Sequence, residues 1–320
     1  MPDMMEEKII EALKESTKVP NHGVILGIGD DAAVTEIKSD HQLVTASDVI
    51  ALGTHYPEGI DPQSIGHRCL AVNLSDIAAM GATPLWANLI VSLPTVELDW
   101  INKFIEGFAN IANQFNVTLI GGDTIHGPEF FAVSLQGVVY KDQYIARSGA
   151  QIDDLIYVSG QLGDASYGLK IIEKKTVTAG NQLLVDKFLY PNPRVGEAKI
   201  ISAFASSMID LSDGLYSDLM KIMSESSVSA EIDVSKLPIS TLLSDQLSSE
   251  AAINQALLGG DDYELCFTIP ANKEMEFLEV HQSFSDPLFT RIGKIRQGSD
   301  LKLFNGKEDF VISKEPYNHF

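Results

Sequence analysis

The spacing of apolar residues predicts helices and strands along the whole chain. Between residues 100 and 115, apolar side chains recur every three or four positions, which is typical of an amphipathic helix. Apolar runs bounded by Gly, Asn or Asp indicate strands at 24–28, 32–37, 43–46, 85–91, 117–120, 130–140, 207–211 and 263–269. The predicted fold class is therefore mixed α/β.

Local signals add helix boundaries to this pattern. Asp61 followed by Pro62 is a favoured helix start, and Gly81 fits the end of that helix. Helical spacing also predicts a short amphipathic helix at 4–15 and another at 214–224. The sequence Tyr-Pro-Asn-Pro at 190–193 predicts a turn that precedes a helix.

The length of the chain favours two domains over one. A chain of 320 residues is long enough to form two hydrophobic cores, and 45% of its residues are hydrophobic. The periodic pattern breaks near 147–149, and a new strand is predicted to begin at Leu155. We therefore predict an N-terminal domain at 1–147 and a C-terminal α/β domain at 148–320.

The charge balance limits the partners of the protein. The 44 acidic and 23 basic residues give a formal net charge of −21, which disfavours nucleic acid and anionic membranes. Small anionic ligands stay possible, because bound metal ions invert a local field. Cys69 and Cys266 lack metal-ligand spacing and suit a reducing compartment. Without a signal-peptide pattern or a membrane-length apolar run, we expect a soluble cytoplasmic protein.

Acidic residues gather in six short motifs that also contain Gly or Ser. Each motif follows an apolar run, and the motifs contain Asp30 and Asp31, Asp48, Asp76, Asp123, Asp210 and Asp213, and Asp261 and Asp262. Any single motif is typical of an ordinary turn or cap. Six together favour a site, and we predict Asp123 and Asp210 at strand ends, where α/β proteins build sites.

Converging carboxylates would need cations. At 4 Å and the reduced dielectric of a partly buried site, each pair repels by roughly 4 kcal/mol. Because these motifs offer only oxygen ligands, Mg²⁺ with phosphate oxygens is the expected partner. Adjacent glycines let backbone amides approach a phosphate, and Arg147 offers a rigid cationic fork or, equally, a surface ion pair.

The sequence lacks the common catalytic motifs of other phosphate-handling and hydrolytic enzymes. It has no Walker A lysine motif, no protein-kinase catalytic loop and no nucleophile elbow. A general base is unnecessary if the acceptor is a phosphate monoester, whose second pKa is about 6. Such an acceptor needs alignment and neutralisation of charge, which metal ions supply.

Taken together, the motifs resemble those of the thiamine-monophosphate kinase family, within the aminoimidazole ribonucleotide synthetase-like superfamily. They lie at 27–33, 73–82, 121–124, 209–215, 258–268 and 317–320, in order along nearly the whole chain. The resemblance implies an ATP- and Mg²⁺-binding N-terminal domain whose strands form a dimer β-barrel. It implies a C-terminal domain that completes the active site. It also implies a homodimer that phosphorylates thiamine monophosphate directly from ATP, in line, with several Mg²⁺ ions.

The resemblance also implies roles for individual residues. Implied metal ligands are Asp31, Ser47, Asp48, Asp76, Asp123, Asp210 and Asp213, and the neighbouring Asp30 is either a further ligand or an acid behind the ligands. Implied catalytic residues are Asp123 and Asp213, and implied ATP-binding residues are Gly122, Asp123, Arg147 and Ser212. Implied substrate-binding residues are His55, Asp261 and Tyr317. The family usually has Glu at the position of Asp261 and often Trp at that of Tyr317.

Other functions stay open at this stage. Among sister enzymes, a selenophosphate synthetase would carry a reactive Cys before Cys69, and the hydrogenase-maturation protein would end in Cys rather than Phe320. Aminoimidazole ribonucleotide synthetase fits the predicted fold, although it fits the 258–268 and terminal motifs less well. A non-catalytic divalent-cation-binding protein would explain the acids without an EF-hand loop. A metal-dependent phosphatase would act on the monophosphate without ATP.

Overall fold

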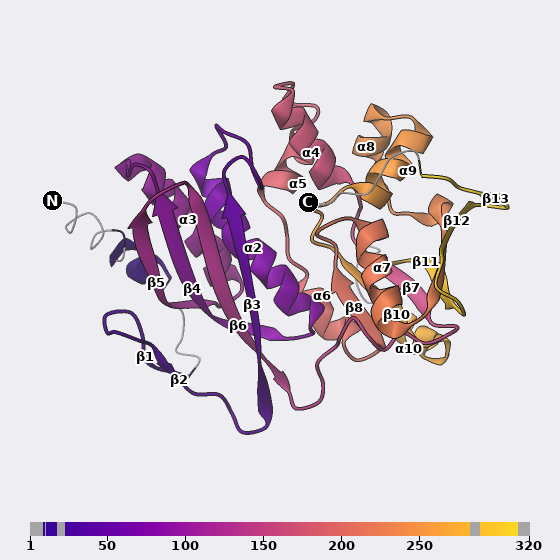
Figure 1. The fold of residues 1–320 in the computed structure, drawn as a ribbon, viewed down its shortest axis with the longest axis horizontal. Helices are drawn as coiled ribbons and strands as arrows, with labels where there is room; N and C mark the ends of the chain where they lie inside the picture. Colours follow the sequence, from indigo (N-terminus) through magenta and orange to yellow (C-terminus); the bar gives the residue numbers. More distant parts are fainter. Residues whose placement is uncertain (1–8, 10, 18–22, 282–288, 313–320) are drawn as a thin grey trace. The chain divides into compact units, whose positions relative to one another are not determined.

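The computed structural model describes residues 9, 11–17, 23–281 and 289–312, which fall into two compact units (Figure 1). The first unit comprises Met1–Ile77 and Ala82–Tyr144, and the second comprises Ala78–Gly81 and Ile145–Phe320. Both mix helices and strands, so the predicted α/β class is confirmed.

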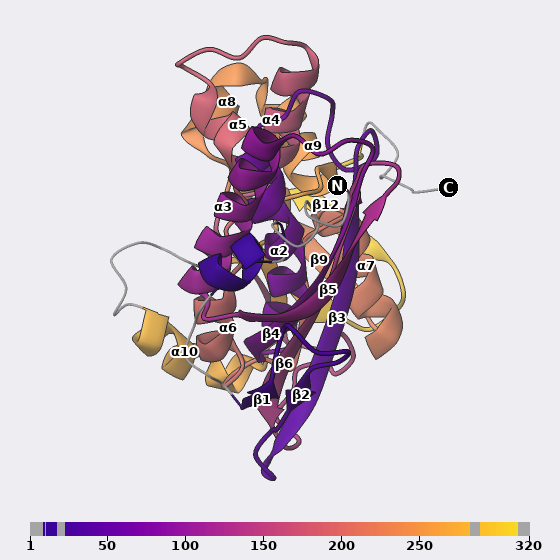
Figure 2. The same cartoon turned by 90° about the vertical axis from the view of Figure 1, so that its left-hand side faces the viewer.

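The first unit is built on a four-stranded sheet covered by two helices. The sheet has the order β3-β6-β4-β5 and pairs antiparallel except for parallel β4 and β5, which are joined through a helix, as parallel strands require. The strands are β3 (His41–Ala51), β4 (Thr83–Leu93), β5 (Thr118–His126) and β6 (Phe130–Tyr140). The helices are α2 (Pro62–Ala79) and α3 (Leu98–Gln114), and Figure 2 shows both on one side of the sheet. A separate hairpin pairs β1 (Val24–Leu26) with β2 (Val34–Thr35).

Buried and partly exposed residues alternate along β6, and the buried ones contribute to the core beneath this sheet. Every second β6 residue is buried, because the strand is covered on the helix side only. On the buried side, the ring of Phe131 stacks on Phe104 of α3 with 4.4 Å between the ring centroids. The residues between them, such as Ala132 and Val138, lie on the opposite face, which we call the open face of the sheet.

Two glycines allow α2 and α3 to cross at backbone contact. A Cβ at Gly66 of α2 would lie 2.0 Å from the carbonyl oxygen of Phe104, and one at Gly107 of α3 would lie 1.8 Å from that of Gln63. No larger residue fits either position without separating the helices. Glycine weakens a helix interior, so these two are explained by the close crossing.

The second unit contains a seven-stranded sheet with helices packed around it. The strand order is β13-β12-β9-β11-β7-β10-β8, antiparallel except for β12 and β9. The strands are β7 (Leu155–Ser159), β8 (Ser207–Asp210), β9 (Ser229–Asp233), β10 (Leu265–Ile269), β11 (Phe289–Arg296), β12 (Leu301–Asn305) and β13 (Glu308–Asp309). The helices are α4 (Asp164–Glu173), α5 (Gln182–Leu189), α6 (Val195–Ile201), α7 (Leu215–Ser226), α8 (Thr241–Gln246), α9 (Ser249–Leu258) and α10 (Glu274–His281).

Two apolar clusters stabilise this unit. The larger joins the central strands to α7 and α9 through side chains such as Ile209, Leu219 and Cys266. The smaller packs α4, α5 and α8 together around Leu184 and Leu243. Through Ile209, the larger cluster packs the sheet edge that ends in β8, and β8 leads directly into the acidic 210–213 motif.

Most elements expected from the sequence are present. Residues 130–140 form a strand with the predicted bounds, and the predicted helix at 100–115 is α3, which begins two residues earlier. Described residues 9 and 11–15 of the predicted N-terminal helix are helical, and residue 16 continues the helix. The turn at 190–193 does precede a helix, α6. Among the described residues, no helix combines the length and apolarity needed to cross a membrane.

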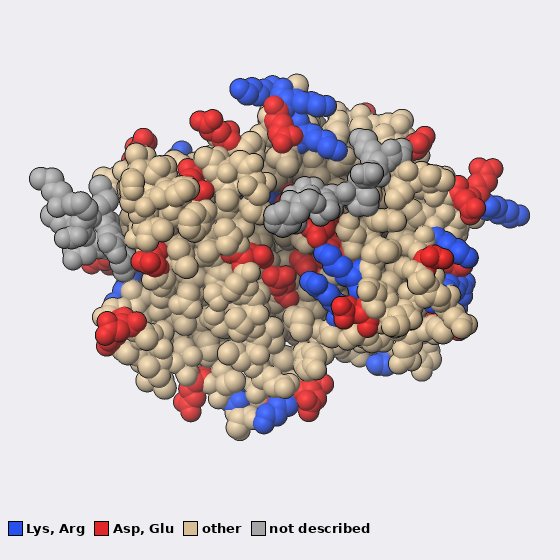
Figure 3. All heavy atoms as spheres, viewed as in Figure 1, with Lys and Arg blue, Asp and Glu red and all other residues tan. Residues whose placement is uncertain are grey.

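Charge is distributed over the surface rather than confined to one tail. Figure 3 shows acidic side chains dispersed across the face in view. Part of the net charge of −21 is therefore carried by this folded face.

The glycine crossing of α2 and α3 can be tested by substitution. We expect Gly107→Ala to lower the free energy of unfolding by roughly 2 kcal/mol or more, because the added methyl overpacks a backbone contact. Gly196→Ala in α6 is the matched control, because its Cβ meets nothing within 4 Å. The control should be neutral or gain up to about 1 kcal/mol from helix propensity. Urea denaturation followed by circular dichroism measures both, and equal effects would contradict the crossing.

Candidate active site

Backbone hydrogen bonds bring two acidic motifs of the second unit together. Beyond the last paired residues of β8 and β10, Leu211 donates its N–H to the carbonyl of Glu264 at 2.8 Å. The N–H of Tyr263 bonds the carbonyl of Leu211 at 2.9 Å, and that of Asp261 bonds the carbonyl of Ser212 at 2.9 Å. The 210–213 and 259–264 segments therefore continue the antiparallel pairing as two joined loops.

This pairing places four predicted site residues side by side. They are Asp210, Ser212, Asp213 and Asp261. The prediction that Asp210 lies at a strand end is confirmed, because β8 ends there. Gly260 makes the close approach possible, since a Cβ there would lie 2.5 Å from the carbonyl oxygen of Ser212. Only glycine tolerates that distance.

Asp213 is tied to the first turns of the following helix. Gly214 adopts a positive φ of 103° and caps α7. Asp218, inside α7 and fully buried, accepts the N–H of Asp213 at 3.0 Å. The Lys221 ammonium, a turn further along, donates to Asp213 Oδ2 at 2.6 Å and to Asp218 Oδ1 at 2.7 Å. Sequence reasoning missed Asp218 and Lys221, although their three-residue spacing on a predicted helix was a usable signal.

A buried ion pair supports the loop that carries Asp261. Arg194 donates two parallel bonds to Glu264, from Nε at 2.6 Å and from Nη2 at 2.5 Å, and Ser159 Oγ also donates to Glu264 at 2.5 Å. Burial opposes the charge of the guanidinium, but Glu264 and Glu197 raise the pKa of Arg194 above its ordinary value. The guanidinium is therefore charged at neutral pH, and its pairing with Glu264 was not predicted from the sequence.

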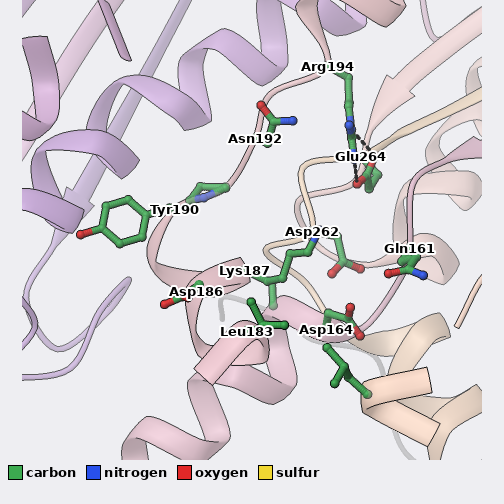
Figure 4. Close-up of a pocket in the computed structure, with 13 residues that line it drawn as sticks. Gln161, Asp164, Leu183, Asp186, Lys187, Tyr190, Asn192, Arg194, Asp262 and Glu264 are labelled. Atoms are coloured by element: carbon green, nitrogen blue, oxygen red, sulfur yellow. Dashed lines mark hydrogen bonds and ion pairs between the residues drawn. The ribbon is translucent and has the colours of Figure 1, made fainter. Parts of the chain in front are cut away.

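A cavity of about 330 Å³ lies beside this ion pair (Figure 4). It is lined by Gln161, Asp164, Ala165, Leu183, Asp186, Lys187, Tyr190, Pro191, Asn192, Arg194, Leu242, Asp262 and Glu264. In Figure 4 the Asp164 and Asp262 carboxylates both face the cavity, and the ring of Tyr190 points away from the ion pair. No residue that the sequence singled out for metal, ATP or substrate lines it.

Two carboxyls of this cavity are shifted toward the neutral form. Burial raises the pKa of Asp262 well above its ordinary value, and nearby Glu264 and Asp164 raise it further, against a bond from the Gly163 N–H. Burial likewise raises the pKa of Asp164, although a bond from Ser240 lowers it in part. The wall of the cavity therefore holds protons more tightly than exposed aspartates do.

In the first unit, three predicted ligands lie inside regular elements rather than at junctions. Asp48 is within β3, Asp76 within α2, and Asp123 within β5, which continues to His126. The prediction that Asp123 ends a strand is therefore wrong, because β5 stays paired with β4 up to His126.

Two acids of the first unit, Asp48 and Asp123, lie on the opposite edge strands of the sheet. The Asp48 N–H bonds Asn73 Oδ1 of α2 at 3.1 Å, and Asp76 follows Asn73 by three residues on the same helix. Asp123 lies on the opposite edge strand, where its own carboxylate accepts the Thr124 N–H at 2.9 Å. Two strands separate Asp48 from Asp123, which corresponds to about 14 Å across the sheet.

The other predicted residues of this unit differ in how closely they are fixed. Asp30 and Asp31 are exposed, and Asp30 Oδ1 accepts the Asp31 N–H at 2.9 Å. Ser47 precedes Asp48 in β3, so the two side chains point to opposite faces. His55 Nδ1 accepts the Ala51 N–H at 3.1 Å. Gly122 has a φ of 153° and lets β5 approach the carbonyl of Leu89.

Arg147 lies apart from the joined loops of its own unit, and Tyr317 lies outside the described residues. The carbonyl of Arg147 accepts a bond from Ser226 Oγ at the end of α7, whereas Asp213 precedes the start of that helix. The two ends of α7 are roughly 16 Å apart. Across the described ranges, no three His, Cys, Asp or Glu side chains are close enough together to hold a metal ion.

The raised pKa of Asp262 predicts how its substitution changes stability with pH. Native Asp262 binds its proton more tightly than the unfolded chain, so wild-type stability falls as pH rises from 3.8 through the raised native pKa. Asparagine has no such proton. We therefore expect the unfolding free energy of Asp262→Asn, minus that of wild type, to grow between about pH 5 and pH 8.

Denaturation midpoints of both proteins across this range provide the measurement. Asp153→Asn is the control, because a bond from Lys294 lowers the pKa of that exposed carboxyl below its ordinary value. Its titration falls outside this range, so its difference from wild type should stay flat. A flat or falling difference for Asp262→Asn would contradict the assignment.

Comparison with known proteins supplies the family. The family model described as AIR synthase related protein, N-terminal domain, matches residues 29–139, and that of the C-terminal domain matches 151–305. A thiamine-monophosphate kinase from Buchnera aphidicola subsp. Acyrthosiphon pisum is 41% identical and covers 92% of this chain and 93% of its own.

Solved structures agree with the sequence comparison. The crystal structure of thiamine-monophosphate kinase from Stenotrophomonas maltophilia K279a is 40% identical, with a TM-score of 0.86 over 92% of this chain and 95% of its own. A structure described as AaThiL complexed with AMPPCP and TMP is 28% identical, with a TM-score of 0.78 over 100% of this chain and 98% of its own. The chain therefore belongs to the AIR synthase related proteins and, within them, to the thiamine-monophosphate kinase family.

Proposed function

We propose that this protein transfers the γ-phosphoryl group of ATP to thiamine monophosphate, giving ADP and thiamine diphosphate with the help of Mg²⁺. The observation that carries the proposal is the near-complete match to a relative described in complex with AMPPCP, an ATP analogue, and TMP. The 41% identity to a protein named thiamine-monophosphate kinase supports the same substrates.

The residues present fit Mg²⁺. In the second unit, Asp210, Ser212 and Asp213 offer hard oxygen donors within four consecutive residues. In the first unit, Asp31, Ser47, Asp48, Asp76 and Asp123 offer the same chemistry. Hard oxygen ligands are those that Mg²⁺ prefers, and each ion completes its shell with water and phosphate oxygens. When bound, the ions would neutralise the phosphate charges that otherwise oppose transfer.

The chain's own residues then have to orient the phosphates and the acceptor. We assign Gly122, Asp123, Arg147 and Ser212 to ATP, and His55, Asp261 and Tyr317 to thiamine monophosphate. The guanidinium of Arg147 is exposed and can form two parallel bonds to a phosphate. The backbone of Ser212 is fixed by its bond from Asp261, so the donors in this loop are preorganised.

No residue has to act as a general base in this reaction. The acceptor is a phosphate monoester that is mostly dianionic at neutral pH, since its second pKa is about 6. One of its oxygens forms the new bond to the γ-phosphorus as the bond to the ADP oxygen breaks. Alignment and neutralisation of charge are then sufficient, which agrees with a site made of acids, glycines and one arginine.

We further propose that two copies of the chain pair through the first unit and form the β-barrel expected from the family. The open face of its sheet exposes apolar side chains that include Leu43, Val49, Ile90 and Ile125, each at least 40% exposed. Val49, Ala132 and Ile90 lie in one row across three strands, so apolar side chains are neighbours there. Such a face is stabilised when a second copy covers it.

We place the protein in the cytoplasm, in agreement with its cysteines. Cys69 and Cys266 are both buried as free thiols. Burial raises the pKa of each thiol above its ordinary value, so neither is a reactive thiolate. Both are stable in a reducing compartment without forming disulfides.

The reaction is tested by ADP release from ATP and Mg²⁺ with three alternative acceptors: thiamine monophosphate, free thiamine and formylglycinamidine ribonucleotide. We expect ADP and, by mass, thiamine diphosphate with the monophosphate only. ADP with the ribonucleotide alone would assign the purine-type activity of the superfamily. Phosphate release from the monophosphate without ATP would indicate a phosphatase, and silence throughout would indicate a binding protein.

The same assay tests the role of Asp123. We expect Asp123→Asn to lower kcat by about 100-fold or more, because a charge that acts on the transferring group is lost. Its fold should survive, since asparagine can still accept the Thr124 N–H. Asp142→Asn is the matched control, because that exposed residue has a φ of 61°, which asparagine tolerates. Near wild-type turnover of folded Asp123→Asn would refute the assignment.

The dimer is tested by sedimentation equilibrium. We expect twice the chain mass of 34.9 kDa for wild type and a shift toward 34.9 kDa for Leu43→Lys on the open face. Met275→Lys in α10 makes the same kind of change at a residue 71% exposed in the second unit and should stay dimeric. A wild-type monomer, or equal masses for both variants, would contradict pairing through this face.

A further inference from the structure

Lys221 joins a surface carboxylate to a buried one. Its ammonium lies 2.6 Å from Asp213 Oδ2 and 2.7 Å from Asp218 Oδ1. The side chain of Asp213 is 28% exposed, whereas that of Asp218 is 1% exposed. The lysine is therefore fixed at its inner end by a carboxylate that cannot turn toward water.

The burial of Asp218 distinguishes this arrangement from an ordinary surface ion pair. A buried carboxylate needs a counter-charge and hydrogen bonds, and Asp218 obtains them from Lys221 and from the Asp213 N–H. The two bonds, of 2.6 and 2.7 Å, hold the Lys221 ammonium between the two carboxylates.

The chain contains a natural comparison for this geometry. Lys236 pairs with Asp233 at the same three-residue spacing, but over 3.6 Å and with 59% of the lysine side chain exposed. Such exposed pairs are weak and are screened by salt. Lys236 therefore has the charge and the spacing of Lys221 without its buried anchor.

Resting on the proposed role of Asp213 as a Mg²⁺ ligand, we propose that Lys221 is a tethered cation that competes with the divalent ion for this carboxylate. The Lys221 ammonium donates a bond to Asp213 Oδ2, so an incoming divalent ion must displace the ammonium or bind next to it. With a metal–oxygen distance of about 2.1 Å, the two positive charges would lie within roughly 5 Å of each other. Lys221 thereby lowers the affinity of the site for divalent ions.

The same contact has a positioning role. When no divalent ion is bound, Lys221 gives Asp213 a partner and holds its side chain against α7. Asp213 thus keeps its place at the end of the joined loops, and the ion meets a carboxylate that is already oriented. Lys221 therefore both lowers the affinity for divalent ions and fixes the orientation of the Asp213 carboxylate, because Asp218 holds the lysine in place.

The test is direct binding of Mn²⁺, as a spectroscopic probe for Mg²⁺, to the full chain without nucleotide, followed by electron paramagnetic resonance of the free ion. The binding that Asp213→Asn removes identifies the site. We expect Lys221→Met to tighten this binding by about fivefold to tenfold, because the repulsion from the ammonium is lost. Lys236→Met should leave it unchanged.

The double variant Asp218→Asn with Lys221→Met separates competition from net charge. It removes one negative and one positive charge together, so a pure effect of net charge would restore wild-type affinity. Competition for Asp213 predicts binding that stays at least about threefold tighter than wild type. This variant also leaves no buried charge without a partner, so it keeps the test valid if Lys221→Met alone fails to fold.

The outcomes distinguish competition by Lys221 from the metal-binding role of Asp213. Unchanged or weaker Mn²⁺ binding in folded Lys221→Met, with binding lost in Asp213→Asn, would overturn the competition and leave the metal role of Asp213 intact. Wild-type affinity in the double variant would do the same. Unaltered binding in Asp213→Asn would instead overturn the metal assignment itself and, with it, this inference.

Discussion

The second unit depends on the buried carboxylate of Glu264. It accepts two bonds from Arg194 at the start of α6 and one from Ser159 at the end of β7, and its backbone carbonyl bonds Leu211 beyond β8. Removing one partner of a buried ion pair costs about 3–5 kcal/mol, because the remaining charge has no counter-charge. Since the partners come from separate segments, satisfying this one charge fixes where those segments meet.

The joined acidic loops follow from that constraint. Once Glu264 is fixed, the residues before it must run antiparallel to the residues after β8, and the bonds from Tyr263 and Asp261 complete the pairing. Asp210 is therefore placed by the end of β8, and Asp213 follows in a loop that backbone hydrogen bonds join to the 259–264 segment. Rigid elements hold a constellation of charges more accurately than loops do, which suits a reaction that needs alignment and charge neutralisation.

The sequence predicted the elements better than the placement of the acids within them. Helix α3 and strand β6 were recognisable because their burial is one-sided, which gives a clean periodicity. Asp48 and Asp123 resembled strand ends because polar residues and glycines interrupt the apolar runs. The strands continue through them because β3 stays paired with β6, and β5 with β4, by backbone hydrogen bonds that do not depend on side-chain polarity.

The other features that were not predicted from the sequence are contacts between residues far apart along the chain. Arg194 and Glu264 are 70 residues apart, and Ser159 and Glu264 are 105 apart. No local pattern records such pairs. The close crossing at Gly66 and Gly107 is similar, because an isolated glycine in a helix has the same local pattern whether a second backbone lies against it or not. The three-residue spacing of Asp218 and Lys221 is a local pattern that could have predicted their pairing. The importance of the pair comes from the burial of Asp218, which the sequence does not show.

Position 261 shows how backbone conformation can favour one residue type. Asp261 has a φ of 66°, in the left-handed region that Asp enters several times more readily than most residues with a side chain. Two residues later Tyr263 is also left-handed, at 50°, and its hydroxyl bonds Asp261 Oδ1 at 3.2 Å. Aspartate therefore costs less backbone strain at this position than a longer side chain such as glutamate would. The conformation of the joined loops thus restricts which acidic residue can occupy position 261.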